Sequence, residues 1–322
     1  MKHTKIASRF NFIFNDMKSN LVLALVVVCL CSCTNTRKAP NVSEGKMVTY
    51  TSFKSEHIDA RNVDVWLPES YTQGKDHPVL YMHDGQMLFD ASQTWNGQAW
   101  NVQEVLTNLE NDIQPLPIVV VIWNNAAARH ANFVPQKVVD NYATPKLDSI
   151  LRFTMSGEQK LFTEKPNADA YLKFLVDELK PHIDATFNTK SDVANSFIAG
   201  SSMGGLISLY ALLEYPEVFG GAACLSTHWP VVFYVEDNPF PETIASYVSD
   251  NSQALRGKKL YLDRGTKTLE SLYELGQNSI DSIIDAAKID GLIWKSEIFD
   301  GAEHTENDWN KRLDIPLRFL FE

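Results

Sequence analysis

A serine between glycines is the residue of this chain whose setting most clearly predicts covalent chemistry. Ser202 is the middle residue of the segment GSSMG at positions 200–204, which follows the apolar run Ser196–Ala199 and precedes a helical pattern from Leu206 to Leu213. In a strand, a G-x-S-x-G turn and a helix in this order, the serine hydroxyl stands exposed at the carboxyl end of a sheet. The helix N-terminus beside it favours developing negative charge. The spacing therefore predicts Ser202 as a nucleophile in acyl transfer.

A serine nucleophile needs a base, and His304 is the predicted one. In a fold with this strand, turn and helix, the base follows the nucleophile along the chain, which leaves His228 and His304. His304 lies in a loop that follows an apolar stretch and precedes the helical pattern Trp309–Phe319. His228 comes directly after the strand that follows the helix of the nucleophile, so it is interpreted as a pocket-lining residue.

The acid that would orient His304 has two candidates in the segment LYLDRGTKTLE at positions 260–270. Asp263 lies at the end of a predicted strand, and Glu270 lies in the loop or first turn beyond it. A carboxylate of either type can fix the histidine tautomer and stabilise its charged form. The spacing leaves both residues open as the acid.

The oxyanion of an acyl-transfer reaction needs backbone donors, and two are predicted here. The strand pattern at Val79–Met82 continues into the loop HDGQ at positions 83–86. In this kind of fold one N–H comes from such a loop and the other from the residue after the nucleophile. The predicted donors are therefore the backbone N–H groups of Gln86 and Met203. The side chains of His83 and Asp84 are interpreted as hydrogen-bonded supports of the loop.

The substrate pocket is predicted from aromatic and cationic residues near these segments. Trp123, Arg129, His228 and Trp229 are the predicted substrate-binding residues, with Trp95 and Trp100 as further aromatic candidates. The long irregular stretch 124–165 is expected to cover one end of the sheet. No histidine, cysteine and aspartate cluster has the spacing of a metal site, and the predicted chemistry requires no cofactor.

Alternating strand and helix patterns predict the fold class. Short apolar runs bounded by turn residues predict strands buried on both faces. Helical patterns lie between them, and Pro181 is expected to kink or end the helix that carries Leu172, Leu175, Leu179 and Ile183. Strands that alternate with helices predict an α/β fold with a mostly parallel central sheet covered on both faces. The predicted strands lie at Val63–Leu67, Pro78–Met82, Pro117–Trp123, Ser196–Ala199, Gly221–Leu225 and Lys259–Leu262.

Composition fits one large globular domain and argues against two classes of partner. The chain has 322 residues, a net charge of −11 and 44% hydrophobic residues. Its first 33 residues carry a net charge of +3, which leaves −14 on the remainder. A region with this negative charge is a poor candidate for binding nucleic acid or an anionic membrane surface through charge. The sequence gives no prediction of the oligomeric state.

The N-terminal segment has the pattern of a signal that directs a protein to the cell envelope. Leu21–Leu30 is an apolar run of signal-peptide length that follows Lys18. It ends in LCSC at 30–33, which resembles a bacterial lipobox, so Cys33 is the predicted lipidation site. We expect a lipoprotein signal peptide at 1–33, a polar tether at 34–46 and one catalytic domain at 47–322. The expected location is the envelope of a Gram-negative bacterium, lipid-anchored and facing the periplasm.

From about Thr49 onward the sequence resembles the putative esterase family of α/β hydrolases, which includes esterase D-like proteins, feruloyl esterases and enterochelin esterases. The resemblance implies the α/β-hydrolase fold. Many members place the acid three residues past a glycine, at a position that is Thr268 here. Relatives with a Thr-Leu-Asp segment match Glu270, which the resemblance therefore favours over Asp263. The matching segments, in order, are LYMHDGQMLFD (80–90), VVVIWNN (119–125), FVPQK (133–137), YLKFLVDELKPHID (171–184), IAGSSMGG (198–205), LYLDRGTKTLESLY (260–273) and FDGAEHTENDW (299–309).

The function expected from these observations is that of a serine carboxylesterase. The resemblance implies feruloyl or acetyl esters of polysaccharides as substrates. A siderophore esterase of the enterochelin type and an acyltransferase are alternatives, although anionic siderophores suit an acidic body less well. An alternative of another class is a non-catalytic envelope binding protein on a hydrolase scaffold.

Overall fold

The computed structural model describes residues 37–322 with the exception of 73, 143, 156–160, 163 and 234–235. The predicted signal segment Leu21–Leu30 and the predicted lipidation residue Cys33 lie outside the described residues. None of the described helices combines the length and apolar character needed to cross a membrane.

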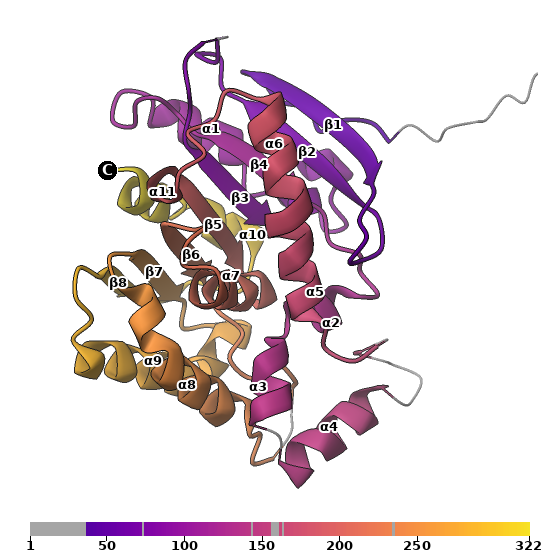
Figure 1. The fold of residues 1–322 in the computed structure, drawn as a ribbon, viewed down its shortest axis with the longest axis vertical. Helices are drawn as coiled ribbons and strands as arrows, with labels where there is room; N and C mark the ends of the chain where they lie inside the picture. The colour runs from indigo at the N-terminus through magenta and orange to yellow at the C-terminus, as the bar shows by residue number, and fades with distance from the viewer. Residues whose placement is uncertain (1–36, 73, 143, 156–160, 163, 234–235) are drawn as a thin grey trace, which may run out of the picture. The chain divides into compact units, whose positions relative to one another are not determined.

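One eight-stranded sheet organises the described part of the chain, with strand order β1-β2-β4-β3-β5-β6-β7-β8 (Figure 1). The pairs β1–β2 and β2–β4 are antiparallel, and every pair from β4 to β8 is parallel. The mostly parallel sheet predicted from the sequence is therefore confirmed. The strands are β1 (Lys46–Phe53), β2 (Arg61–Leu67), β3 (Val79–His83), β4 (Ile118–Ile122), β5 (Ser196–Ser201), β6 (Gly221–Leu225), β7 (Lys259–Arg264) and β8 (Ile293–Ile298).

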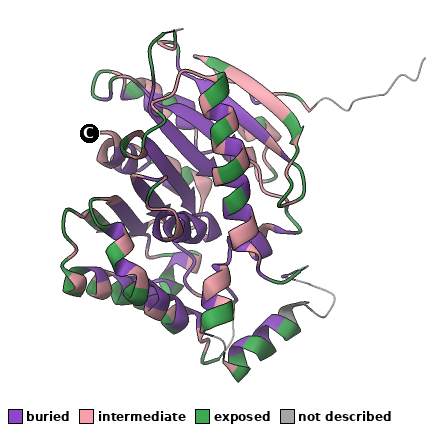
Figure 2. Cartoon of the chain, viewed as in Figure 1, coloured by how far each residue is buried: buried purple, intermediate pink, exposed green. Residues whose placement is uncertain are grey.

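Burial explains why the central strands read as unbroken apolar runs. Every residue of β3, β4, β5 and β6 is buried, so both strand faces need apolar or hydrogen-bonded side chains (Figure 2). The edge strand β8 is different, because Ile293 and Ile298 are more than half exposed. Two of the buried strands, β3 and β5, end at the loops that carry Gln86 and Ser202, whereas the loop that carries His304 follows the edge strand β8.

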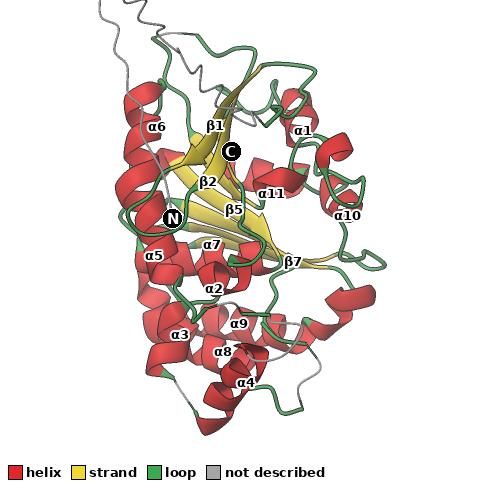
Figure 3. Ribbon diagram, turned by 90° about the vertical axis from the view of Figure 1, so that its right-hand side faces the viewer, coloured by secondary structure: helices red, strands yellow, loops and turns green. Residues whose placement is uncertain are grey.

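Helices cover both faces of the sheet, and each layer has its own apolar cluster (Figure 3). One cluster joins Val79 and Tyr81 to α5, α7, α8 and α9, and the other joins Leu80 and Met82 to α1, α10 and α11. Successive side chains of β3 therefore point into opposite layers, as the strand period requires. The helices are α1 (Val102–Asn108), α2 (Arg129–Phe133), α3 (Gln136–Asn141), α4 (Pro145–Met155), α5 (Ala168–Lys173), α6 (Lys180–Thr186), α7 (Met203–Glu214), α8 (Phe240–Asn251), α9 (Glu274–Ala287), α10 (Glu306–Asn310) and α11 (Asp314–Phe321).

Two helix predictions need correction. Of the two outcomes expected at Pro181, a kink or an end of the helix, the second does not occur, because the chain passes from α5 through a π-helical stretch, η3 (Phe174–Leu179), directly into α6. Pro181 falls in the first turn of α6, where its missing N–H is tolerated, and the wider π turn shifts the hydrogen-bond pattern just before it. The predicted closing helix Trp309–Phe319 is divided into α10 and α11.

The residues just before β1 pack on the domain. Arg37 forms an ion pair with the buried Asp64, and its guanidinium lies 4.1 Å from the ring centroid of Trp123. Asn41 donates to Asp90, and Ser43 donates to Gln103. Part of the predicted tether 34–46 therefore contacts the domain through Arg37, Asn41 and Ser43.

Candidate active site

Ser202 lies in the turn between β5 and α7 with a strained backbone. Its φ of 58° and ψ of −123° fall in a region that non-glycine residues rarely adopt. A Cβ atom on Gly200 would lie 2.7 Å from the backbone carbon of Gly204, so glycine at position 200 allows the strand and the helix to approach this closely. The turn predicted from GSSMG is therefore present, with the serine at the end of a central strand.

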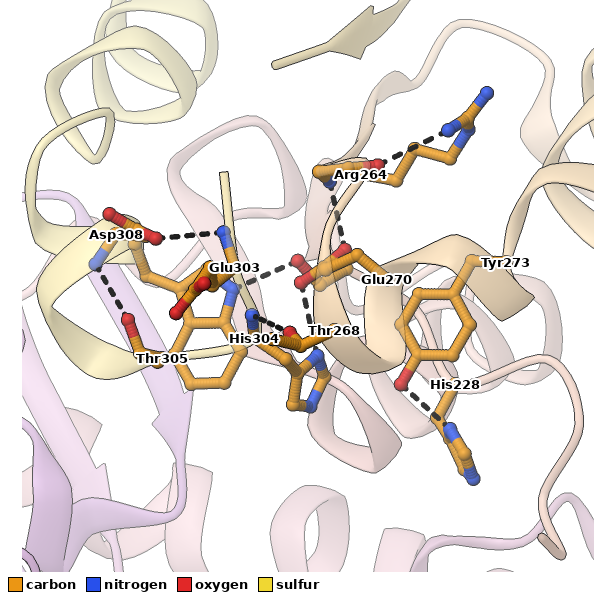
Figure 4. A network of polar contacts seen from close by, with 12 residues as sticks. His228, Arg264, Thr268, Glu270, Tyr273, Glu303, His304, Thr305 and Asp308 are labelled. Carbon is orange, nitrogen blue, oxygen red and sulfur yellow. Dashed lines mark hydrogen bonds and ion pairs between the residues drawn. The ribbon is translucent and has the colours of Figure 1, made fainter. Parts of the chain in front are cut away.

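Glu270 contacts His304 by a hydrogen bond that spans two loops (Figure 4). The Nδ1 atom of His304 lies 3.0 Å from Oε1 of Glu270, and the other carboxylate oxygen accepts from the backbone N–H of Gly265 at 2.8 Å. Glu270 is fully buried on the short helix η6 (Thr268–Leu272). Burial alone raises its pKa, but hydrogen bonds from His304, Ser226 and Gly265 and the charge of His304 outweigh burial and hold the pKa below its ordinary value. The ionised carboxylate accepts a hydrogen bond from Nδ1–H of His304, which leaves Nε2 of His304 as an acceptor.

The two loops that carry this pair are joined by backbone contacts. The N–H groups of Thr266 and Lys267 both donate to the carbonyl of Ala302, at 3.1 and 3.0 Å. A Cβ atom on Gly265 would lie only 2.3 Å from the same carbonyl oxygen, so glycine is required for this approach. Thr268 has a φ of 53°, and its hydroxyl accepts from the backbone N–H of His304 at 3.2 Å.

Sequence reasoning missed this supporting role of Thr268, which it treated only as a position unable to act as the acid. The glycine directly after a strand was the available signal that two loops approach each other there.

Asp263, the alternative acid, has other partners and makes no hydrogen bond to His304 in the described structure. Its carboxylate accepts from Arg312 at 3.0 and 3.2 Å and from the backbone N–H of Ser226 at 3.0 Å. Burial raises the pKa of Asp263, and the charge of Arg312 opposes that rise in part. Of the two carboxylates that the sequence left open, the structure therefore brings Glu270, and not Asp263, to His304. Strand β7 directs Asp263 toward Arg312 instead.

The loop after β3 is fixed by polar contacts on both sides of Gln86. Asp84 receives two hydrogen bonds from Arg129, at 2.6 and 2.8 Å, and the Gln86 side chain accepts from the backbone N–H of Asn124 at 3.2 Å. Burial raises the pKa of Asp84, but the charge and hydrogen bonds of Arg129 hold it below its ordinary value. Gln86 belongs to the short helix η1 (Gly85–Met87). The loop predicted to carry one oxyanion donor is thus rigidly supported.

A cleft of about 630 Å³ brings the predicted catalytic residues to one surface. Ser202, His304 and Gln86 line it, and Met203 begins the helix directly beneath Ser202. Its rim carries an exposed indole, Trp95, beside Asn96, whose side chain donates to Glu306 at 2.7 Å. The described residues contain no group of three histidine, cysteine or carboxylate side chains that could hold a metal ion. The cleft is also lined by Asp84, Met87, Gln98, Trp100, Asn124, Ala126, Arg129, His130, Ser201, Thr305 and Trp309.

The predicted substrate-binding residues divide into two groups. Arg129 lines the cleft, although its guanidinium is held by Asp84. Trp229 is instead a core residue, because its indole packs against Gly276 and donates to Gln277. The indole N–H of Trp123 donates to Asp64, and Trp123 does not line the cleft.

His228 is also buried and has no surface in the cleft. Its Nδ1 atom lies 2.8 Å from the hydroxyl of Tyr273. Trp309, which sequence reasoning did not assign to the site, packs edge-on against His304 with ring centroids 4.8 Å apart.

The contacts of Asp263 predict a structural role that stability measurements can test. Asp263→Asn removes the charge that compensates the buried Arg312, so we expect a loss of about 3 kcal/mol in the free energy of unfolding. Urea denaturation of the variant and the wild type measures this difference. Asp112→Asn, which alters an exposed pair with Arg318, is the matched control and should change stability little. An unchanged denaturation midpoint for Asp263→Asn would contradict this role.

Comparison with known proteins adds a family model and a sequence relative. The model described as "Putative esterase" matches residues 56–320. An endo-1,4-beta-xylanase/feruloyl esterase of Xylanibacter ruminicola is 27% identical over 293 residues. That alignment covers 89% of this chain and 32% of the relative, so the chain spans about a third of the relative's length.

Solved structures share the fold at low sequence identity. A ferulic acid esterase superposes with a TM-score of 0.59 and 18% identity, over 86% of this chain and 98% of that one. The enterobactin esterase FES from Shigella flexneri superposes with a TM-score of 0.54 and 18% identity, over 88% of this chain and 60% of that one. At this level of identity the likeness shows the α/β-hydrolase fold alone.

Proposed function

Because the chain belongs to the "Putative esterase" family, we propose that it is a serine carboxylesterase with Ser202 as nucleophile and His304 as base. The observation that carries the proposal is the buried Glu270–His304 pair in the same cleft as a serine on a strained turn. Perturbed groups and strain that meet in one cleft are typical of an active site.

The proposed reaction has two steps, acylation of Ser202 and hydrolysis of the acyl-enzyme, and His304 transfers a proton in each. His304 Nε2 accepts the Ser202 Oγ proton while Oγ attacks the ester carbonyl, and the imidazolium then protonates the departing alcohol. Glu270 stabilises the charged imidazole through the Nδ1–H hydrogen bond. The backbone N–H groups of Met203 and Gln86 would stabilise the oxyanion. Water, activated by His304, then hydrolyses the acyl-enzyme.

Variants of the nucleophile and the acid test this proposal. We expect Ser202→Ala to reduce hydrolysis of 4-nitrophenyl acetate to the uncatalysed rate. Glu270→Gln removes the charge that stabilises the imidazolium, so kcat should fall by about 10²–10⁴-fold. Glu274→Gln, four residues away and largely exposed, is the matched control and should hydrolyse the ester as the wild type does. Hydrolysis by Ser202→Ala at the wild-type rate would contradict the proposal.

For the substrate, we propose aromatic acyl or acetyl esters carried on polysaccharide. The cleft rim supports this, because the exposed Trp95 offers a stacking surface and Asn96 and Gln98 offer hydrogen bonds, a combination that suits a sugar chain. The xylanase/feruloyl esterase relative points the same way. A triscatecholate siderophore is less well matched, because Arg129 is already paired with Asp84 and Glu306 adds negative charge to the rim.

Trp95→Ala separates sugar recognition from chemistry. Loss of the stacking surface should raise KM for feruloylated arabinoxylan oligosaccharides by about tenfold, consistent with ~1.4 kcal/mol of lost contact. Methyl ferulate and 4-nitrophenyl acetate, which lack the sugar, should keep their kinetic constants. Equal losses on all three esters, or preferential turnover of enterobactin, would argue against polysaccharide esters. Transfer of the acyl group to added alcohols, measured in the same assays, would reveal acyltransfer, and inactivity on every ester would favour a binding protein.

We also propose that Cys33 carries a lipid anchor that holds the domain at the periplasmic face of a Gram-negative envelope. The apolar run Leu21–Leu30 ahead of LCSC supports this location. Cys33→Ala should move the protein from the membrane pellet to the soluble fraction of lysed cells. Ser32→Ala is the control and should remain in the pellet. Equal retention of both variants would contradict lipidation at Cys33.

A further inference from the structure

Arg37 belongs to the predicted tether, yet its side chain is a largely buried part of the domain. Its guanidinium forms an ion pair with Asp64, whose side chain is fully buried, and lies 4.1 Å from the ring centroid of Trp123. Asp64 also accepts from the indole N–H of Trp123 at 2.8 Å. The indole is therefore held on its face by the cation and at its N–H by the carboxylate.

Asp64 and Trp123 are the groups that hold this guanidinium within the described part of the chain. No other cation forms an ion pair with Asp64 there, and the Nε and Nη1 atoms of Arg37 are buried without a hydrogen-bond partner. A buried carboxylate that loses its cation is strongly destabilising. Removal of Arg37 would free one face of the indole and leave the Asp64 charge unpaired, and both changes act on Trp123.

Trp123 packs against the loop that carries one proposed oxyanion donor. A Cβ atom on Gly85 would lie 2.8 Å from Cδ1 of the indole, so this glycine lies directly against the ring. Gln86, whose backbone N–H is the proposed donor, is the next residue of the same short helix, η1. Asn124 adds a second contact, because its backbone N–H donates to the Gln86 side chain at 3.2 Å. A shift of Trp123 would therefore move the backbone of Gln86.

The tether residues after Arg37 are bound to a later part of the segment that follows β3. Asn41 donates to Asp90 through its backbone and side-chain N–H groups, at 3.0 and 2.8 Å. The carbonyl of Ala39 accepts from the side chain of Gln93 at 3.1 Å. The tether thus holds this segment at two places, through the indole near its start and through Asp90 and Gln93 near its end.

Resting on the proposed esterase function, we propose that Arg37 is a positioning residue of the active site, which acts through Trp123 to place the Gln86 N–H where the oxyanion forms. Oxyanion donors stabilise a developing charge when they are fixed in place beforehand, and a small displacement lowers the rate strongly. Trp123 then has a role other than the substrate binding predicted for it, since it does not line the cleft. The catalytic unit accordingly includes part of the predicted tether.

Arg37→Met in the full chain tests the proposal, because it removes the charge and keeps much of the side-chain length. For 4-nitrophenyl acetate we expect kcat to fall about tenfold with KM unchanged, because a displaced oxyanion donor weakens binding of the transition state and not of the ester. Phenylboronic acid, which forms a tetrahedral anionic adduct with a serine hydroxyl, should inhibit the variant about tenfold more weakly. Arg37→Lys keeps a cation near Asp64 and the indole and should retain most of both constants.

Lys137→Met is the matched control, because it breaks a partly buried ion pair with Glu214 that joins α3 to α7. Any loss of stability in this variant should leave kcat and the inhibition by phenylboronic acid unchanged, when both are measured well below its melting temperature. An Arg37 that contributed to stability alone would behave in the same way. Wild-type kcat and wild-type inhibition in Arg37→Met would therefore overturn the proposal.

A double-mutant cycle tests whether the effect passes through the indole. Trp123→Leu should lower kcat by itself, and Arg37→Met should then add little, because the ring through which Arg37 acts is gone. Losses that multiply in the double variant would overturn the proposal.

A neutral pair covers the case in which Arg37→Met does not fold. Arg37→Met combined with Asp64→Asn leaves no unpaired buried charge and should still show the loss of kcat. Wild-type kcat in this double variant would count against the positioning role. An inactive wild type would overturn both this proposal and the esterase function, whereas an active wild type with an unaffected Arg37→Met overturns this proposal alone.

Discussion

The buried carboxylate of Glu270 is the group on which the geometry of the site depends. One of its oxygens accepts from His304 and the other from Gly265, so it joins the loop after β7 to the loop after β8. A carboxylate with no exposed surface persists in ionised form only when such hydrogen bonds replace its water. The close contact of Gly265 with Ala302 is what brings these donors within reach. The orientation of His304 is therefore a consequence of how two loops pack.

Asp263 and Glu270 show how environment assigns different roles to neighbouring carboxylates. Both are fully buried and they lie seven positions apart, yet Asp263 is paired with Arg312 and Glu270 with His304. The first pair joins β7 to the segment between α10 and α11, and its Arg312 also bonds Ser226. Ser226 in turn accepts from Trp309, which packs against His304. Asp263 thus supports, through Arg312 and Ser226, the tryptophan that packs against His304.

The outcome of the sequence predictions follows from the range of each interaction. The strands β2 to β7, the Ser202 turn and the order of residues along the chain depend on local patterns, and these could be predicted. The edge strands β1 and β8 were missed, because each exposes part of its length and has no unbroken apolar run. The partner of Asp263 is 49 residues away, and the glycine that receives Trp229 lies across the core, so spacing could not assign either side chain. The continuation of the helix past Pro181 could not be predicted, because a π-helical stretch precedes it and no apolar pattern distinguishes a π turn from an α turn.

The strained backbone of Ser202 is maintained by contacts on every side of it. A conformation of this kind costs about 1–3 kcal/mol and persists only when its surroundings determine it. The Ser202 N–H donates to Leu225 on β6, and the Ser202 carbonyl accepts from Leu206 on α7 and from His228. Since α7 is buried from Met203 to Leu213, the packing around the helix opposes any shift that would relieve the strain at Ser202. The sheet and α7 therefore fix the Ser202 backbone before any ester arrives.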